Sequence, residues 1–167
     1  MLPLRPLLLA TVLLTGCPRG ARPDDALEPN DDPARATPLT LDTPVEARAN
    51  QGNPDVFSVE APAGRTLVFL AESRGLEVCP AFTVNGPGGE ALFEDVHANC
   101  NRTAEEPRKA PGVEFHTRFG AGTSAEAYEL RIPTAQPGRY LLTILEQGRA
   151  DNLAPFSWDY RLTARVE

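Results

Sequence analysis

The chain has 167 residues, 41% of them hydrophobic, and a formal net charge of −7 at pH 7. This length and composition suit a single domain with its own core. The acidity excludes nucleic acid as the expected partner, because phosphate binding needs clustered Lys and Arg, and it argues against docking on an anionic lipid surface through protein charge.

Residues 1–16 have the character of a signal peptide. Arg5 is their only charge, and the apolar run over residues 7–14 is too short to span a bilayer as a mature helix. The run ends in Leu14-Thr15-Gly16-Cys17, which resembles a bacterial lipobox, where small residues precede a cysteine that receives lipid. The resemblance implies a lipoprotein anchored in the membrane through several acyl chains on Cys17. A plain secretory signal with a chance cysteine is the alternative.

Residues 17–27 are predicted to be the lipidated cysteine and a flexible tether. They are small, charged and Pro-bearing, and they show no hydrophobic period. Pro18, and not Asp, follows Cys17. In Gram-negative bacteria Asp at that position favours retention in the inner membrane, so resemblance to this rule favours the outer membrane. The expected location is therefore the bacterial cell envelope, with lipid as the membrane contact.

Two further cysteines, Cys79 and Cys100, are left in what would be an oxidising compartment. An even pair there predicts a disulfide, which would contribute roughly 3 kcal/mol by constraining the unfolded chain. The alternative is a zinc site in which His97 and His116 join the two cysteines. Its spacing differs from that of a Cys-x-x-Cys knuckle, which favours the disulfide.

The body of the chain favours short strands over helices. Seventeen prolines and thirteen glycines interrupt it, and several segments alternate between apolar and polar residues. The clearest is the last, where Trp158, Tyr160 and Leu162 would point to one side and Asp159 and Arg161 to the other. About eight strands are expected, near 45–49, 56–61, 66–71, 78–84, 114–119, 128–132, 140–145 and 158–166. Such a series predicts an all-β, antiparallel β-sandwich.

Turn signals stand between these segments, at 63–64, 85–89, 120–122 and 136–138. The segments at 66–71 and 140–145 are apolar on both faces, which is typical of central strands. The polar stretch 91–109 is expected to be a long loop that the disulfide holds down.

A series of short motifs carries a family resemblance: Glu28-Pro29-Asn30-Asp31, Ala36-Thr37-Pro38-Leu39, Asp55-Val56-Phe57-Ser58-Val59, Ala63-Gly64, Pro137-Gly138-Arg139-Tyr140 and Tyr160-Arg161-Leu162. Together they resemble the bacterial pre-peptidase C-terminal domain, and the similar region is assigned to residues 28–167. The resemblance implies a jelly-roll-like β-sandwich. It also implies an accessory, non-catalytic module of the kind usually appended to secreted proteases.

The acidic opening also predicts a calcium site. Glu28, Asn30, Asp31 and Asp55 supply hard oxygens, with Asp32 or Asn53 as further candidates. Calcium takes six to eight such ligands. In collagenase modules that resemble this chain, the acidic opening and the Asp before the aromatic strand hold calcium jointly. The alternative is a solvated acidic linker, with Asp55 at a strand end.

No catalytic motif is found, so we expect no enzyme. The chain has two histidines and four serines, and it contains neither a Gly-x-Ser-x-Gly elbow nor a His-Glu-x-x-His sequence. The expected function is a lipid-anchored, non-catalytic binding module for peptide, glycan or an envelope protein. A structural subunit of an envelope complex is the alternative.

Overall fold

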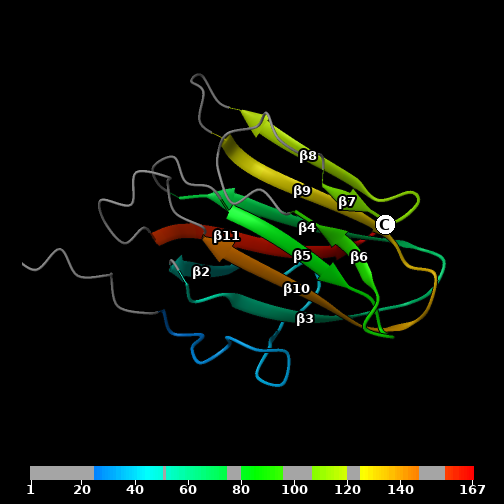
Figure 1. Cartoon of the computed structure of the whole chain (residues 1–167), viewed down its shortest axis with the longest axis horizontal. Helices are drawn as coiled ribbons and strands as arrows, with labels where there is room; N and C mark the ends of the chain where they lie inside the picture. The colour runs from blue at the N-terminus through cyan, green and yellow to red at the C-terminus, as the bar shows by residue number, and fades with distance from the viewer. Residues whose placement is uncertain (1–24, 51, 75–79, 96–106, 120–124, 147–156) are drawn as a thin grey trace, which may run out of the picture.

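The computed structural model describes residues 25–50, 52–74, 80–95, 107–119, 125–146 and 157–167. Two β-sheets lie face to face with the core between them (Figure 1). Within the described residues there are eleven strands and no helix, and hence no helix long and apolar enough to cross a membrane. The predicted all-β sandwich is confirmed.

The first sheet has six strands. In spatial order they are β1 (Thr37–Pro38), β3 (Asp55–Ala61), β10 (Gly138–Glu146), β5 (Pro80–Asn85), β6 (Ala91–Glu94) and β7 (Arg108–Lys109). The second sheet has five strands, in the order β2 (Val45–Asn50), β11 (Ser157–Val166), β4 (Thr66–Ser73), β9 (Ala125–Pro133) and β8 (Glu114–Phe119). Both segments that are apolar on two faces, β4 and β10, lie inside their sheets, as predicted.

Alternation along β11 follows the sequence pattern. Trp158, Tyr160 and Leu162 are buried, whereas Asp159 and Arg161 between them are partly exposed. Trp158 stacks on Tyr160 with ring centroids 4.5 Å apart, and Phe57 meets Tyr160 edge-on at 6.4 Å. This aromatic packing fixes the Tyr160 ring, and so it fixes the place of the Tyr160 hydroxyl.

Two details of the expected fold are corrected. The stretch 91–109 is not one long loop, because β6 and β7 form at its two ends and pair with each other. Phe93 is the anchor, since it is fully buried in an otherwise polar segment. The sandwich is also not wholly antiparallel, since β1 runs parallel to β3 with Thr37 opposite Phe57. These short strands account for the difference between about eight strands and eleven.

The predicted turns at 63–64, 85–89 and 136–138 are confirmed as the links β3–β4, β5–β6 and β9–β10. Gly64 and Gly89 adopt φ values of 72° and 80°, a region that side chains with a Cβ rarely enter. The turn at 120–122 lies outside the described residues.

Candidate functional site

The candidate site lies where the N-terminal segment meets the start of β3, at the left of Figure 1. The Asn30 carbonyl accepts a hydrogen bond from the Val56 amide at 2.9 Å. The Asn53 amide donates to the Asn50 carbonyl at 3.0 Å, which closes the turn between β2 and β3. Two segments that are distant in sequence are thereby held side by side.

Glu28 bridges these two segments with its carboxylate. Its Oε2 accepts from the Asn30 backbone amide at 2.9 Å, and its Oε1 accepts from Nδ2 of Asn53 at 2.9 Å. Both contacts are partly buried. Glu28 therefore faces the β2–β3 turn. In a solvated linker its carboxylate would have faced open solvent instead.

Asp55 is the buried acid of the site, with 1% of its surface exposed. The Tyr160 hydroxyl donates a hydrogen bond to its Oδ2. Burial raises the pKa of Tyr160 well above its usual value, and the charge and hydrogen bond of Asp55 raise that pKa further. The carboxylates of Asp25 and Glu28 act in the same direction. Three carboxylates thus raise the pKa of one buried tyrosine, so the electrostatic potential at the site is negative.

Asn30 places an amide side chain in the interior of the site. It is 1% exposed, and neither its Oδ1 nor its Nδ2 has a hydrogen-bond partner within the part of the chain that the structure describes. Leaving such a buried amide unsatisfied costs about 1–3 kcal/mol, and most buried polar side chains in folded proteins have a partner. The Asn30 backbone contacts the Glu28 carboxylate and the Val56 amide next to Asp55. A side-chain amide oxygen is a suitable ligand for a hard cation.

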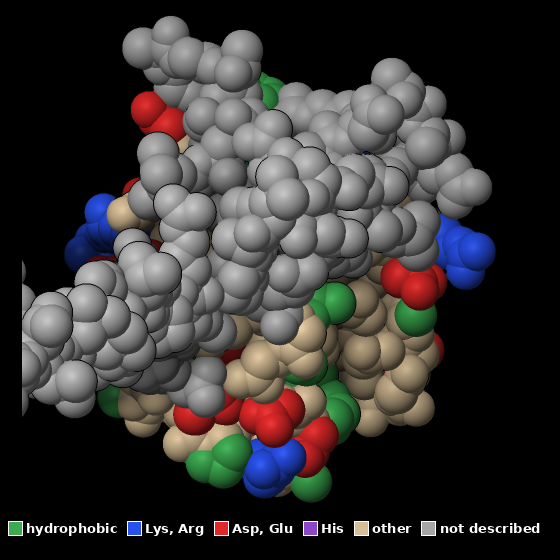
Figure 2. All heavy atoms as spheres, turned by 60° about the vertical axis from the view of Figure 1, so that its left-hand side comes forward, with side chains coloured by type: hydrophobic (Ala, Val, Ile, Leu, Met, Phe, Trp, Pro, Cys, Tyr) green, Lys and Arg blue, Asp and Glu red, His purple; other side chains and the backbone are tan. Residues whose placement is uncertain are grey.

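The remaining acids of the opening lie apart from this group. Asp31 and Asp32 both contact the Arg35 guanidinium, at 3.3 and 2.8 Å, and all three side chains are exposed. The hydrogen bond from Arg35 holds the pKa of Asp32 below its usual range. Figure 2, which brings this end of the molecule forward, shows Asp and Glu side chains gathered on it. Among the described residues, no three His, Cys, Asp or Glu side chains are placed to hold a metal ion by themselves.

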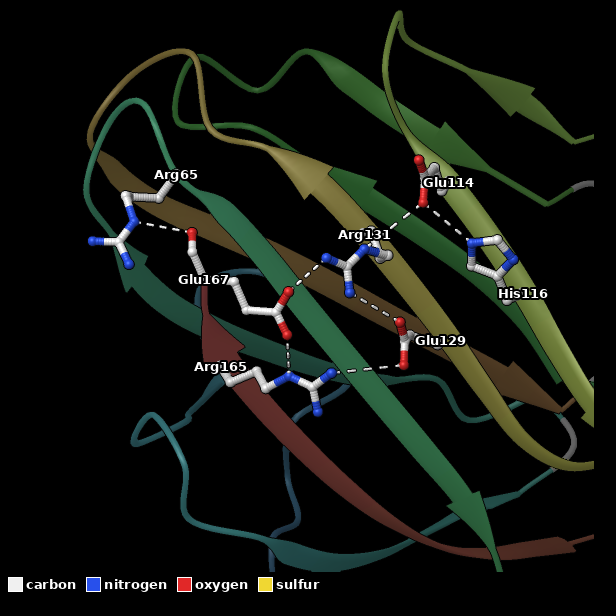
Figure 3. Close-up of polar contacts among 7 residues, drawn as sticks. All are labelled: Arg65, Glu114, His116, Glu129, Arg131, Arg165 and Glu167. Carbon is white, nitrogen blue, oxygen red and sulfur yellow. Dashed lines mark hydrogen bonds and ion pairs between the residues drawn. The ribbon is translucent and has the colours of Figure 1, made fainter.

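Several predicted site residues lie outside the described part of the chain: Cys17, Cys79, His97 and Cys100. His116 is described, and it lies on the exposed face of β8, with Nε2 3.2 Å from a Glu114 oxygen (Figure 3). Glu114 and Arg118, which flank His116 on the same face, are exposed as well, so this face of β8 is a solvated sheet surface.

Sequence reasoning missed two residues of the site, Tyr160 and Asp25. Tyr160 was expected only as a core residue, although a buried tyrosine hydroxyl usually finds a hydrogen-bond partner, and that rule pointed to a polar group nearby. Asp25 falls in the predicted tether, yet its Oδ2 accepts from the Arg48 backbone amide at 2.5 Å. Leu27 packs against the core as well. Asp25, the first residue that the structure describes, is therefore already in contact with the sandwich.

A pocket of about 400 Å³ opens beside the site, along the outer edge of β2 and the start of β11. Its charged walls are already paired, because Arg48 contacts Asp159 at 2.5 Å and Arg74 contacts Glu46 at 3.6 Å. The complete lining is Asp25, Glu46, Ala47, Arg48, Arg74, Asp159 and Tyr160.

No protein-family model matches the chain, and no curated protein matches it. Among solved structures, it is similar to CorA, a surface-associated copper-binding protein of Methylomicrobium album BG8, at 8% identity and a TM-score of 0.48, over 79% of this chain and 98% of that one. It is also similar to PliG, a periplasmic inhibitor of g-type lysozyme from Aeromonas hydrophila (14% identity, TM-score 0.45, 79% and 96% covered).

A third similar structure is the pre-peptidase C-terminal domain of a Bacillus anthracis collagenase. It shows 14% identity and a TM-score of 0.42 over 86% of this chain and 98% of that one. Likeness of this degree carries no argument about function. The described residues show a two-sheet β-sandwich whose N-terminal end gathers Glu28, Asn30, Asp55 and Tyr160.

Proposed function

We propose that the chain is a lipid-anchored, non-catalytic module of the bacterial cell envelope that binds calcium at its N-terminal end. The observation that supports the calcium site is Asn30, whose buried amide has no hydrogen-bond partner in the described residues. It adjoins the bridging Glu28 and, through the Val56 amide, the start of β3 at Asp55.

Glu28, Asn30 and Asp55 would hold the ion, each through side-chain oxygen. A divalent cation would offset the mutual repulsion of carboxylates that are partly withdrawn from water. Asp31 would join this set by exchanging its contact with Arg35 for the ion, because that contact is exposed and contributes little to stability. When bound, calcium would join the N-terminal segment to β3. The proposed partners of the module are peptide, glycan or another envelope protein.

The test compares thermal melts of residues 25–167, which contain all eleven described strands, in millimolar calcium and in chelator. Binding to the folded state alone should stabilise it by about 2.7 kcal/mol at a hundred times the dissociation constant. Asp55→Asn should lose this response, because it removes one charged ligand. The quantity compared is the difference between the midpoints in calcium and in chelator, measured for each protein separately. A variant that is less stable in chelator can therefore still be scored for its response to calcium.

Asp42→Asn is the matched control. It makes the same chemical change at an exposed position with φ 60°, a conformation that Asn tolerates as well as Asp. Its response to calcium should equal that of the unmodified chain. A midpoint of the unmodified chain that does not move with calcium would refute the site.

A further inference from the structure

The two sheets have four edges, and three of them are protected against pairing with another strand. β1 and β7 have two residues each, which is too short for a stable ladder. On β2, the backbone amide of Arg48 donates to the Asp25 carboxylate, and the Asp25 side chain thereby occupies that edge. β8 is different: it has six residues, and among the described residues it pairs with β9 alone.

The β8 strand is held firmly by its inner face. Phe115 packs against Phe93 with ring centroids 5.1 Å apart, and it stacks parallel to Tyr128 at 6.2 Å. The outer face carries Glu114, His116 and Arg118, and all three are exposed. The edge is therefore a preformed strand with a fixed orientation, and not a segment that must fold before it can pair.

From this edge we infer that β8 pairs antiparallel with β8 of a second copy, about a two-fold axis at His116. Such an axis stands perpendicular to the sheet, so outer-face residues meet outer-face residues. His116 then lies opposite its own copy. Glu114 lies opposite Arg118 of the second copy, and the symmetry produces this pair twice. Two five-stranded sheets become one continuous sheet.

The charge pattern selects this register over its neighbours. A shift of the axis to Thr117 would place His116 opposite Arg118 of the second copy and would leave Glu114 opposite Gly120, outside the strand. With the axis at His116, opposite charges face each other at cross-strand distance, and such pairs stabilise an antiparallel ladder. Within one chain Glu114 lies 3.2 Å from His116 and 3.7 Å from Arg131, as Figure 3 shows. Arg118 lies 3.9 Å from Glu72. Surface ion pairs of this kind contribute little to stability, so Glu114 and Arg118 can exchange them for contacts with a second copy.

Phe119 stands at the end of the strand pair. It is the one large hydrophobic side chain among the described residues that is clearly exposed, at 39%. In the proposed register Phe119 lies opposite Val113 of the second copy, which precedes β8 and is buried in its own core, so Phe119 stands just beyond the paired residues. A six-residue strand pair is a small interface, so the dimer is expected to be weak and transient. This inference does not depend on the calcium site.

Cysteine trapping tests the register in the full chain. Residues directly opposite in an antiparallel pair have Cα atoms about 4.5–5.5 Å apart, which is within reach of a disulfide. Under mild oxidation, His116→Cys should form a covalent dimer on a non-reducing gel. Arg118→Cys is the matched control on the same exposed face, and it should not form one, because it lies opposite Glu114 and not opposite itself.

The unsubstituted chain gives the background from its own three cysteines. The proposal is overturned if His116→Cys yields no more dimer than this background. It is equally overturned if Arg118→Cys yields as much dimer as His116→Cys, since the register would then be wrong.

Charge reversal provides the second test, by sedimentation of residues 25–167 at increasing concentration. Glu114→Arg or Arg118→Glu alone places like charges opposite each other twice, and each should weaken dimerisation about ten-fold. The double variant restores both pairs with their signs exchanged and should dimerise within about three-fold of the unmodified chain. Far-UV circular dichroism checks that each variant is folded. An unmodified chain that stays monomeric at every concentration, or a double variant as weak as the singles, would reject the pairing.

Discussion

The hydrogen bond between Tyr160 and Asp55 joins the aromatic core to the candidate site. Tyr160 is fixed by its stack on Trp158, and its hydroxyl meets a carboxylate at the first residue of β3. Both residues are buried. A hydrogen bond to a buried charge contributes more than one between neutral groups, so removing the Tyr160 hydroxyl takes a strong hydrogen bond from the Asp55 carboxylate.

Tyr160→Phe should therefore destabilise the domain by about 2–3 kcal/mol in chelator, measured by guanidinium unfolding followed by circular dichroism. Tyr140→Phe is the matched control. Its hydroxyl donates to the neutral Gln136 carbonyl at 2.7 Å, so its loss should cost about 1 kcal/mol. Equal costs for the two variants would show that the Asp55 charge adds nothing to the bond.

Alkaline pH should act on the same residue. Burial and the Asp55 carboxylate raise the pKa of Tyr160 in the folded state, so the folded protein retains a proton that the unfolded chain releases. The corresponding stability is fully present below the ordinary tyrosine value near 10 and is lost as pH rises above it. In an absorbance titration, the last phenolate signal should appear together with the loss of circular dichroism. Complete ionisation of all three tyrosines in a still folded protein would contradict this expectation.

At the scale of elements, the outer face of β4 shows how a charged surface can cover an apolar strand. Val68 points away from the core and is nevertheless 0% exposed. Its cross-strand neighbours are Arg131 on β9 and Arg165 on β11. Figure 3 shows both guanidinium groups on this face, linked to Glu129 and Glu167. Because Arg131 and Arg165 lie opposite Val68 on both sides, we attribute its burial to their aliphatic stems, whose charged ends reach water.

Arg131→Met and Arg131→Ala separate the two roles of this side chain. Methionine keeps an unbranched apolar stem over Val68, so it should cost within about 0.5 kcal/mol, the usual worth of exposed ion pairs. Alanine uncovers Val68 and should cost about 1 kcal/mol more. Unfolding at low and high salt measures both costs. The ion pairs, and not the covering of Val68, would dominate the contribution of Arg131 if two results were found together. The methionine variant would be as unstable as the alanine variant, and high salt would remove the difference in stability between both variants and the parent chain.

At the scale of the whole molecule, the proposed anchor determines how the sandwich is presented. Asp25, eight residues after Cys17, is in contact with the fold. An extended segment of that length spans at most about 30 Å. A lipid on Cys17 would therefore hold the end that carries Glu28, Asn30 and Asp55 near the membrane. The β8 strand lies at the far edge of its sheet from β2.

Cys17→Ser tests the anchor. Without the thiol, no acyl group can be attached, so the variant should remain an unprocessed or soluble precursor. Metabolic labelling with a fatty-acid analogue should mark the parent chain and leave the variant unlabelled. Label retained on the Cys17→Ser protein would show that lipid is attached elsewhere.

The sequence by itself determined the parts of this fold that depend on neighbours along the chain. Alternation along a strand reports which face is buried, and so the inward positions of β11 were predicted individually. Glycine signals located the turns, because a turn depends on the local backbone. Short strands were missed where a pattern of two to four residues carries no period, as in β1 and β7.

Only the tertiary structure decided which polar residues meet. Tyr160 and Asp55 are 105 residues apart, and no local pattern records their contact. Asp31, one residue from Asn30, turns instead to Arg35, because the side chains of adjacent residues can point in different directions. The pairing of β1 with β3, and the edge position of β8 among the described strands, likewise follow from the order of strands in a sheet. That order is set by packing between segments distant in sequence, and it is not encoded within any single segment.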